Sequence, residues 1–201
     1  METEKEDFGK AFWTQRWKDH STKWDIGYPS TPLSDFIDTL TNKELRILIP
    51  GCGNAYEAEY LFSKGFKNVF IADITEEPLQ RFGERVPGFP KDHLLFADFF
   101  QLNSIGKWDL ILEQTFYCAI NPELRSSYVK KMHELLAPKG QLAGVLFNDP
   151  ELTMEGPPFR GDEKEYRERF GKNFNILKME PAKNSIGPRM NRELFFQLEK
   201  K

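Results

Sequence analysis

Residues 45–56 of this 201-residue chain read L-R-I-L-I-P-G-C-G-N-A-Y, a mostly apolar run that ends in two closely spaced glycines. An apolar run of this length predicts a buried strand, and the apolar positions between Ala55 and Phe62 recur at helical spacing. Gly65 follows, where a helix C-terminus favours glycine. The stretch therefore predicts a strand, a glycine turn and a helix, the first unit of an α/β fold.

Apolar runs continue to alternate with helical patterns toward the C-terminus. We expect strands at residues 68–73, 93–98, 108–114 and 140–147, and helices that start at Thr75 and span 122–137. Strands that alternate with helices form βαβ units with a mostly parallel sheet. The sequence therefore predicts a single doubly wound α/β domain.

The last part of the chain has a different pattern. Asp162 and Glu165 are spaced as a capping box for a helix that ends near Gly171. Two further strands are expected at residues 174–179 and 193–199, and the short connection between them contains proline and glycine. Because no helix fits there easily, we expect an antiparallel pair at one edge of the sheet.

Composition narrows the class of protein. The net charge of −3 argues against duplex nucleic acid, which needs several phosphates to be neutralised. Cys52 and Cys118 make no disulfide framework, the start METEKEDFGK has no apolar signal, and no run approaches the length of a membrane helix. We expect a cytoplasmic protein, not bound to a membrane, that works as a monomer on a small molecule without a metal.

Candidate ligand residues lie where the predicted strands end, since open parallel sheets bind ligands at the carboxyl ends of their strands. Gly51 and Gly53 let the backbone approach a ligand, and Asp73 is placed to accept hydrogen bonds from ribose hydroxyls. Asp98 closes the third predicted strand, where an acid can meet an adenine amino group, and Glu113 and Gln114 are expected to point at the middle of the cleft. These residues favour a nucleoside-containing ligand.

An oxidoreductase that uses NAD(P) is one alternative. The dinucleotide fingerprint is G-x-G-x-x-G, and its third position is Tyr56 here. That residue argues against a pyrophosphate-containing cofactor. A protein that binds the nucleoside without any transfer stays open at this point.

The segment F-W-T-Q-R-W-K-D-H-S-T-K-W-D-I-G-Y-P, residues 12–29, precedes the first predicted strand. Its tryptophans alone would suggest a helix that packs on the sheet. Together with I-P-G-C-G, A-D-F-F, F-Y-C-A-I-N-P-E-L-R and G-P-P-F, however, the chain resembles the thiopurine methyltransferase-like family of class I methyltransferases. Within that family it is most similar to the halide and thiol methyltransferases.

The resemblance implies a Rossmann-like, seven-stranded sheet with an antiparallel last strand. It also implies that S-adenosylmethionine is the cofactor, that residues 1–30 cover it, and that the segments 148–161 and 181–192 lie over the methyl acceptor. The residues implied or expected to bind the cofactor are Trp13, Trp17, Trp24, Gly51, Gly53, Asp73, Asp98, Phe99 and Gln114. Family members often have Tyr or Arg at the position of Gln114.

The expected acceptor is a small soft nucleophile such as a thiol, bisulfide, thiocyanate, a halide or a thiopurine. An anionic acceptor needs no base during transfer, and we nominate no catalytic residue. Tyr28 and Asp149 are candidates for lining the acceptor side, and Arg189 and Arg192 for attracting an anion. Methylation of RNA or protein is the alternative, although E-Q-T-F stands where amino-group methyltransferases often carry N-P-P-Y.

Overall fold

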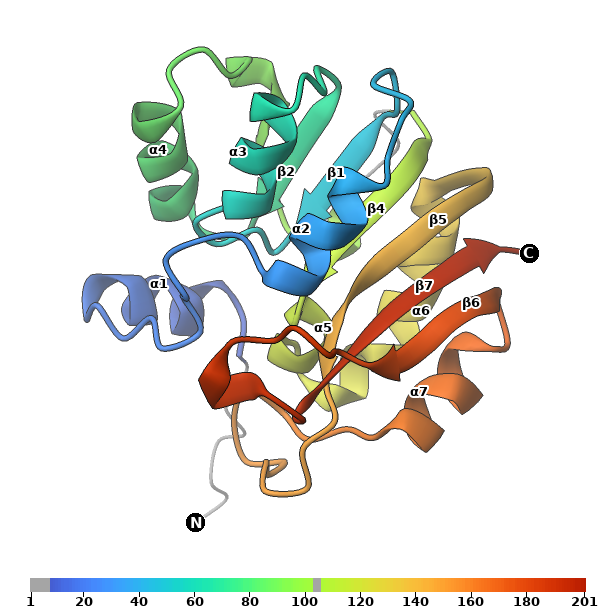
Figure 1. Cartoon of the computed structure of the whole chain (residues 1–201). Helices are drawn as coiled ribbons and strands as arrows, with labels where there is room; N and C mark the ends of the chain where they lie inside the picture. The colour runs from blue at the N-terminus through green and yellow to red at the C-terminus, as the bar shows by residue number, and fades with distance from the viewer. Residues whose placement is uncertain (1–7, 103–105) are drawn as a thin grey trace.

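The computed structural model describes residues 8–102 and 106–201. The apolar run before the glycine turn forms β1 (Ile47–Pro50), all of whose residues are buried at the centre of a seven-stranded sheet (Figure 1). β1 pairs in parallel with both of its neighbours. The strand order is β3-β2-β1-β4-β5-β7-β6, with β2 (Val69–Asp73), β3 (Leu94–Phe96), β4 (Trp108–Gln114), β5 (Leu136–Phe147), β6 (Phe174–Pro181) and β7 (Glu193–Lys200).

The two last strands are antiparallel to each other, as expected. β7 lies between β5 and β6 and runs antiparallel to both. Their connection contains one short 3-10 turn, η4 (Gly187–Arg189), and no α-helix. The predicted doubly wound sheet with an antiparallel last strand is therefore confirmed.

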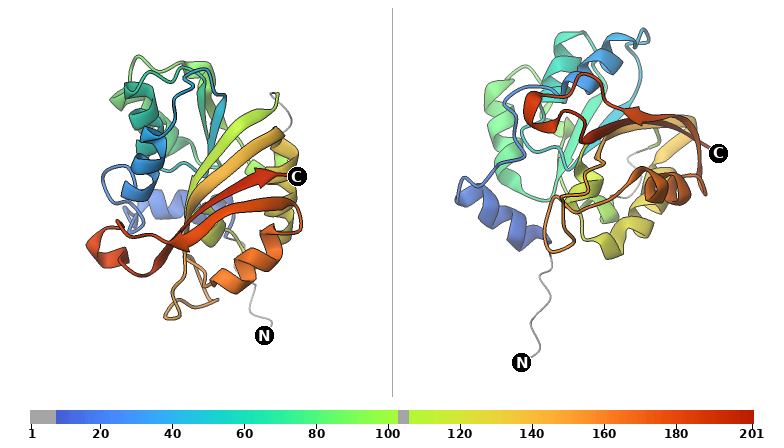
Figure 2. Two further views of the ribbon diagram at one scale, coloured as in Figure 1. Left: turned by 45° about the vertical axis from the view of Figure 1, so that its right-hand side comes forward. Right: turned by 60° about the horizontal axis from the view of Figure 1, so that its bottom comes forward.

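Helices cover both faces of this sheet (Figure 2). One layer packs on β2, β3 and β5 and consists of α2 (Thr31–Asp38), α3 (Tyr56–Ser63) and α4 (Glu76–Arg85). The opposite layer packs on β5 and β6 and consists of α5 (Phe116–Ala119), α6 (Arg125–Leu135) and α7 (Glu163–Phe170). Each layer has its own apolar core, as expected for a sheet buried on both sides.

The helix α1 (Lys10–Lys18) belongs to neither layer. It lies at the end of the sheet, beside the chain segment that leads to α2 (Figure 1). Trp17 is its only residue classed as buried. The structure thus places the tryptophan segment over an end of the sheet and not on one of its faces.

Several element boundaries differ from the sequence prediction. The helix expected over 122–137 is a 3-10 turn, η3 (Pro122–Leu124), followed by α6, and β5 already begins at Leu136. Leu136 pairs with Trp108 of β4 before the register shifts, and a side chain at Gly140 would collide with the Trp108 carbonyl at 2.8 Å. β5 therefore pairs with β4 at Leu136 and again from Gln141, and the Pro-Lys-Gly sequence that suggested a break lies between these two pairings.

Hydrogen bonds support the predicted C-terminus of α3 and the predicted N-terminus of α7. Gly65 has a φ of +88°, and the amide of Phe66 donates to the Leu61 carbonyl, which closes α3. Asp162 accepts from the amide of Glu165 at 2.9 Å and so caps α7. The Glu165 carboxylate, however, points to Arg125 and Arg169, so the capping box is formed from one side.

The strand order reverses between β1 and β4, because the chain moves outward to β2 and β3 on one side and to β5 on the other. In sheets of this kind the loops diverge at that point and leave a crevice at the carboxyl ends of the strands. The topology therefore places a ligand site beyond Pro50 and Gln114.

Among the described helices, none has the length and apolar character needed to cross a membrane.

Candidate functional site

A cavity of about 660 Å³ opens at this end of the sheet. Its walls come from α1, the glycine turn, the ends of β2, β4 and β5, and the segments around Pro157 and Arg189. A volume in this range suits a ligand of drug or cofactor size. The cavity is therefore the candidate active site.

The structure brings the predicted site residues together, apart from Tyr28. Tyr28 is 48% exposed and lies outside the set of residues that line the cavity. The residues predicted from sequence that line it are Trp13, Trp17, Trp24, Gly51, Gly53, Asp73, Asp98, Phe99, Gln114, Asp149, Arg189 and Arg192.

The glycine turn follows β1 directly. Gly51 and Gly53 have φ values of +57° and +51°, a region that residues with a side chain rarely adopt. A Cβ at Gly51 would also lie 2.2 Å from the ring of Phe116. Gly51 is thus required both by its backbone conformation and by the aromatic ring that packs on it.

Asp73 ends β2 and is 8% exposed at the wall of the cavity. Its carboxylate accepts from the amide of Gly53 at 3.1 Å and from the amide and hydroxyl of Thr75 at 2.9 and 2.6 Å. Burial raises the pKa of Asp73, and these hydrogen bonds oppose that shift. A carboxylate has about four acceptor positions, so beside these three bonds it can accept a further hydrogen bond from a ligand.

Asp98 lies two residues beyond β3. Its side chain caps the 3-10 turn η2 (Phe99–Gln101) by accepting from the amide of Phe100 at 2.9 Å. Phe99 is nearly buried, and its ring meets that of Phe116 edge to face with centroids 5.3 Å apart. Asp98 and Phe99 thereby contribute one polar and one aromatic group to the same wall.

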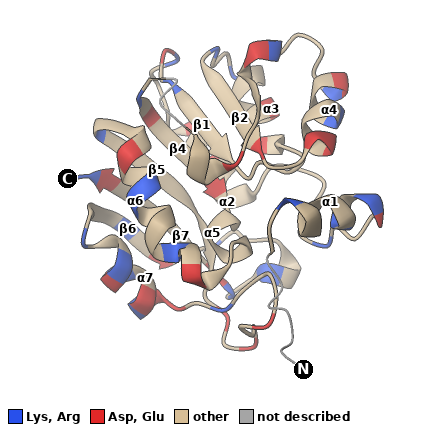
Figure 3. Ribbon diagram, turned by 180° about the vertical axis from the view of Figure 1, so that it is seen from behind, with Lys and Arg blue, Asp and Glu red and all other residues tan. Residues whose placement is uncertain are grey.

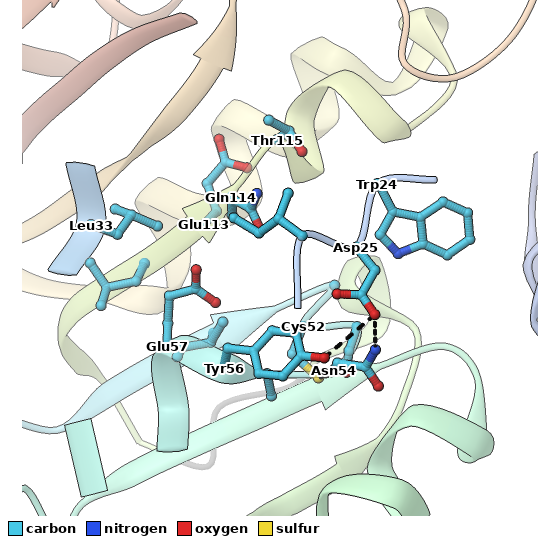
Figure 4. Close-up of a pocket in the computed structure, with 16 residues that line it drawn as sticks. Trp24, Asp25, Leu33, Cys52, Asn54, Tyr56, Glu57, Glu113, Gln114 and Thr115 are labelled. Atoms are coloured by element: carbon cyan, nitrogen blue, oxygen red, sulfur yellow. Dashed lines mark hydrogen bonds between the residues drawn. The ribbon is translucent and has the colours of Figure 1, made fainter. Parts of the chain in front are cut away.

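Glu113 and Gln114 are the last two residues of β4. Gln114 lines the cavity, and its buried Nε2 has no hydrogen-bond partner within the structure. Glu113 is fully buried and accepts from the amides of Phe116 and Tyr117 at 2.5 and 3.2 Å. Glu113 is not among the residues that line the large cavity, but together with Gln114 it lines the adjoining cavity of about 60 Å³ (Figure 4), where it also caps the start of α5.

The three tryptophans form one aromatic cluster. The ring of Trp24 meets those of Trp13 and Trp17 edge to face, with centroids 5.4 and 5.7 Å away. Asp25 then accepts from Asn54 at 2.5 Å and from Tyr56 at 3.5 Å, across a smaller cavity of about 60 Å³ (Figure 4). These bonds tie the tryptophan segment to the glycine turn.

Ion pairs hold the candidate acceptor side. Asp149 is 3% exposed and pairs with Arg192, which also reaches Glu151 at 3.4 Å. Arg189 pairs with Glu193 at 3.3 Å and donates to the carbonyl of Trp24 at 2.7 Å. Both arginines thus already have carboxylate partners, and Arg189 also links the segment 181–192 to the tryptophan cluster.

Sequence reasoning missed several cavity residues. Phe116 and Phe147 stand just beyond β4 and at the end of β5, where the carboxyl-end rule alone would have placed them. Arg16 lies on α1 one turn from Trp13, bonds the Ser21 hydroxyl at 3.2 Å and lies over the ring of Phe12. Its helical spacing with the tryptophans was the available signal.

Comparison with known proteins identifies the family. The sequence profile of the thiopurine S-methyltransferase family matches residues 8–200, nearly the whole chain. The chain belongs to this family. The protein is accordingly a methyltransferase that uses S-adenosylmethionine, and the nicotinamide-dependent alternative is excluded.

Relatives with assigned names support the same family. The chain is 29% identical to a probable thiol methyltransferase 2 and to thiocyanate methyltransferase 1, both from Arabidopsis thaliana. Each alignment covers 90% of this chain and 81% of the relative. A thiopurine S-methyltransferase from Bos taurus is 26% identical over 84% of this chain and 78% of its own.

Solved structures of methyltransferases share the fold. A 1,6-didemethyltoxoflavin-N1-methyltransferase from Burkholderia thailandensis, with its substrate and S-adenosylhomocysteine bound, superposes with a TM-score of 0.78. The superposition covers 96% of this chain and 87% of the other at 15% identity. The present chain therefore resembles the Burkholderia thailandensis enzyme in fold.

The cavity fits S-adenosylmethionine chemically. It offers a buried carboxylate at Asp73 for hydroxyl groups, an unpartnered amide donor at Gln114, and the aromatic cluster of Trp13, Trp17 and Trp24 for a sulfonium cation. Each group comes from a different element of the fold.

Proposed function

We propose that this methyltransferase transfers the methyl group to a small, soft nucleophile, such as bisulfide, a thiolate, thiocyanate, a halide or a thiopurine. The observation that carries the proposal is the state of Asp149, the carboxylate on the acceptor side. It is buried and paired with Arg192. A carboxylate held in this way is poorly placed to remove a proton, so an acceptor that is already anionic suits the site.

The other acids of the cavity are also engaged. Among the described residues that line it, the acids are Asp73, Asp98 and Asp149, and no histidine is present. Asp73 and Asp98 each accept hydrogen bonds from backbone amides near their own strand ends. The names of the relatives, which include a thiol and a thiocyanate methyltransferase, point to the same class of acceptor.

The binding roles follow from placement. We assign the ribose to Asp73, the adenine to Asp98 and Phe99, and the backbone approach to Gly51 and Gly53. The tryptophan cluster and Gln114 complete the cofactor side. When bound, the cofactor supplies a methyl group already activated on a sulfonium, so alignment of the reactants is the main task of these residues.

An acceptor screen with S-adenosylmethionine tests the proposal. Formation of S-adenosylhomocysteine is measured with bisulfide, thiocyanate, iodide and a thiopurine, and in parallel with amines, RNA and protein. We expect turnover with the sulfur or halide acceptors. Turnover only on an amine or on a macromolecule would replace the proposal by the alternative.

Surface charge favours the small-molecule acceptor over nucleic acid. Acidic and basic residues are mixed on α4 and on α7 (Figure 3), and the net charge is −3. Nucleic-acid sites instead concentrate Lys and Arg on one face.

We further propose that the enzyme acts as a monomer in the cytoplasm. Cys52 and Cys118 are free, and Cys118 is fully buried in an apolar core, which suits a reducing compartment. Light scattering of the purified protein tests the monomer, and a stable dimer would contradict it.

A further inference from the structure

Arg125 is the first residue of α6, and only 2% of it is exposed. Its Nη1 donates to both carboxylate oxygens of Glu165 at 3.1 Å. Its Nη2 donates to the carbonyl of Arg160 at 2.9 Å and to that of Phe159 at 3.4 Å. The guanidinium also lies 4.8 Å over the ring of Tyr117. One buried side chain thus connects α6, α7 and a loop.

The loop is the segment 148–161, which we call the acceptor loop. Leu152, Pro157 and Pro158 of this loop line the cavity. The next residue, Phe159, is fully buried, and its amide donates to the carbonyl of Cys118 at 2.7 Å. The wall at Pro157 and Pro158 is therefore adjacent in sequence to the two carbonyls that Arg125 holds.

The geometry requires arginine. A guanidinium presents its donors as a planar fork, so it can serve Glu165 on one side and the loop carbonyls on the other. A lysine ammonium at this position keeps the charge but is a compact point donor on a flexible stem. A lysine would therefore donate either to Glu165 or to the loop carbonyls, but not to both.

We infer that Arg125 is a positioning residue of the acceptor site: it fixes the Pro157–Pro158 wall by holding the carbonyls of Phe159 and Arg160. The inference rests on the proposed function, because it takes this wall to face the methyl acceptor. Arg125 itself is not among the residues that line the cavity. It acts through the loop and touches neither reactant.

Trypsin reports on this contact independently of activity. The peptide bond between Arg160 and Gly161 is a trypsin site, and its own carbonyl is the one that Arg125 holds at 2.9 Å. Proteolysis of a folded protein requires local release of the backbone. In Arg125→Lys we expect cleavage at this bond, identified by mass spectrometry, to accelerate at least fivefold.

Arg169→Gln is the matched control. Arg169 donates to the same Glu165 oxygen at 3.1 Å, but its other side-chain bond goes to Ser126 on α6 and not to the loop. We expect trypsin to cleave the Arg160–Gly161 bond of this control at a rate within twofold of wild type.

Glu165→Gln is the second test variant, because it removes the carboxylate that orients the guanidinium. We expect its cleavage at the same bond to accelerate two- to threefold.

Kinetics then separate positioning from general damage. With bisulfide as acceptor, Arg125→Lys should raise the acceptor KM at least fivefold, while the Kd for S-adenosylhomocysteine changes less than twofold. Cleavage at the wild-type rate in Arg125→Lys, or in Glu165→Gln if the first variant does not fold, would overturn the inference. So would equal losses of acceptor and cofactor affinity. If the wild-type enzyme methylates no sulfur or halide acceptor, the proposed function fails, and the cleavage rates still decide whether Arg125 holds the loop.

Discussion

Two acids near the strand ends of this sheet have opposite surroundings. Asp73 lies at the wall of the cavity and accepts from Gly53 and Thr75. Glu113 lies beside the smaller cavity, where two amides at the start of α5 are its only described hydrogen-bond donors. Burial raises the pKa of both carboxyls, but of the two only Asp73 lines the large cavity.

The first residue-scale prediction concerns Asp73. Asp73→Asn and Asp73→Ala should weaken S-adenosylmethionine binding by about 10- to 100-fold, because a hydrogen bond to a charged group contributes about 1.5–3 kcal/mol. Calorimetric titration measures the affinity, with the exposed Asp92→Ala as control. Wild-type affinity in both Asp73 variants, alongside an intact fold, would show that the ribose assignment is wrong.

The second concerns Glu113. Its pKa is raised from the ordinary value of 4.5 to about 8, since burial disfavours the charged form. The folded state therefore holds a proton that the unfolded state releases between these values, so this contribution to stability is present below pH 4.5 and lost as pH rises through about 8.

Glu113→Gln should consequently gain stability relative to wild type as pH rises from 5 to 9, by up to about a few kcal/mol. The amide oxygen of glutamine can still accept from Phe116 and Tyr117. Urea unfolding at each pH measures the difference, and Glu84→Gln on the exposed surface of α4 provides the control. A difference between Glu113→Gln and wild type that stays constant with pH contradicts the protonated state of Glu113.

At the scale of elements, the sequence predicted best the elements that are marked by buried apolar runs or by local side-chain bonds. The strands β1, β2 and β4 and the cap of α7 follow from apolar runs and local side-chain bonds. The helices α2 and α5 were missed, and α5 has only four residues, which carry little periodic signal.

For the site, most of the residues named from the strand-end rule and the family resemblance line one cavity, and their roles stay predictions. What they could not give was side-chain direction and long-range pairing. Glu113 and Tyr28 lie outside the residues that line the large cavity, and the contacts of Arg189 with Trp24 and of Arg125 with the loop cross more than thirty residues. Such pairs depend on the tertiary fold and have no local pattern.

The tryptophan segment yields the prediction at this scale. α1 lies outside both helix layers, and Trp17 is its only buried residue. Deletion of residues 1–24 should therefore abolish detectable S-adenosylmethionine binding and leave the sheet folded. Circular dichroism reports the fold and calorimetry the binding, with Trp108→Phe in the core of β4 as the control for loss of a tryptophan elsewhere. A truncated protein that binds the cofactor with normal affinity would show that these tryptophans only pack.

At the scale of the whole molecule, the chemistry of methyl transfer depends on whether the residues that line the cavity supply a base to the acceptor. The sheet gathers aromatic rings, two positive-φ glycines and paired charges at one end. Enzymes that deprotonate a hydroxyl or amine need a base within hydrogen-bond reach of the acceptor. In this site the buried carboxylate on the acceptor side is bound to Arg192, so the ionisation of the acceptor itself should set the rate.

The pH dependence of turnover tests this argument with two acceptors. With an alkyl thiol, the initial rate at saturating cofactor should rise toward the pKa of the thiol, about 8.5 for a cysteine-like group, because the thiolate is the reacting form. With iodide the rate should stay nearly flat from pH 6 to 8, since that anion does not protonate in this range. Glu113 is not among the residues that line the large cavity, and circular dichroism at each pH excludes loss of fold as its pKa of about 8 is approached. A bell-shaped or rising profile with iodide would reveal an ionising group of the enzyme in the transfer step, and would require a catalytic residue that the present assignment lacks.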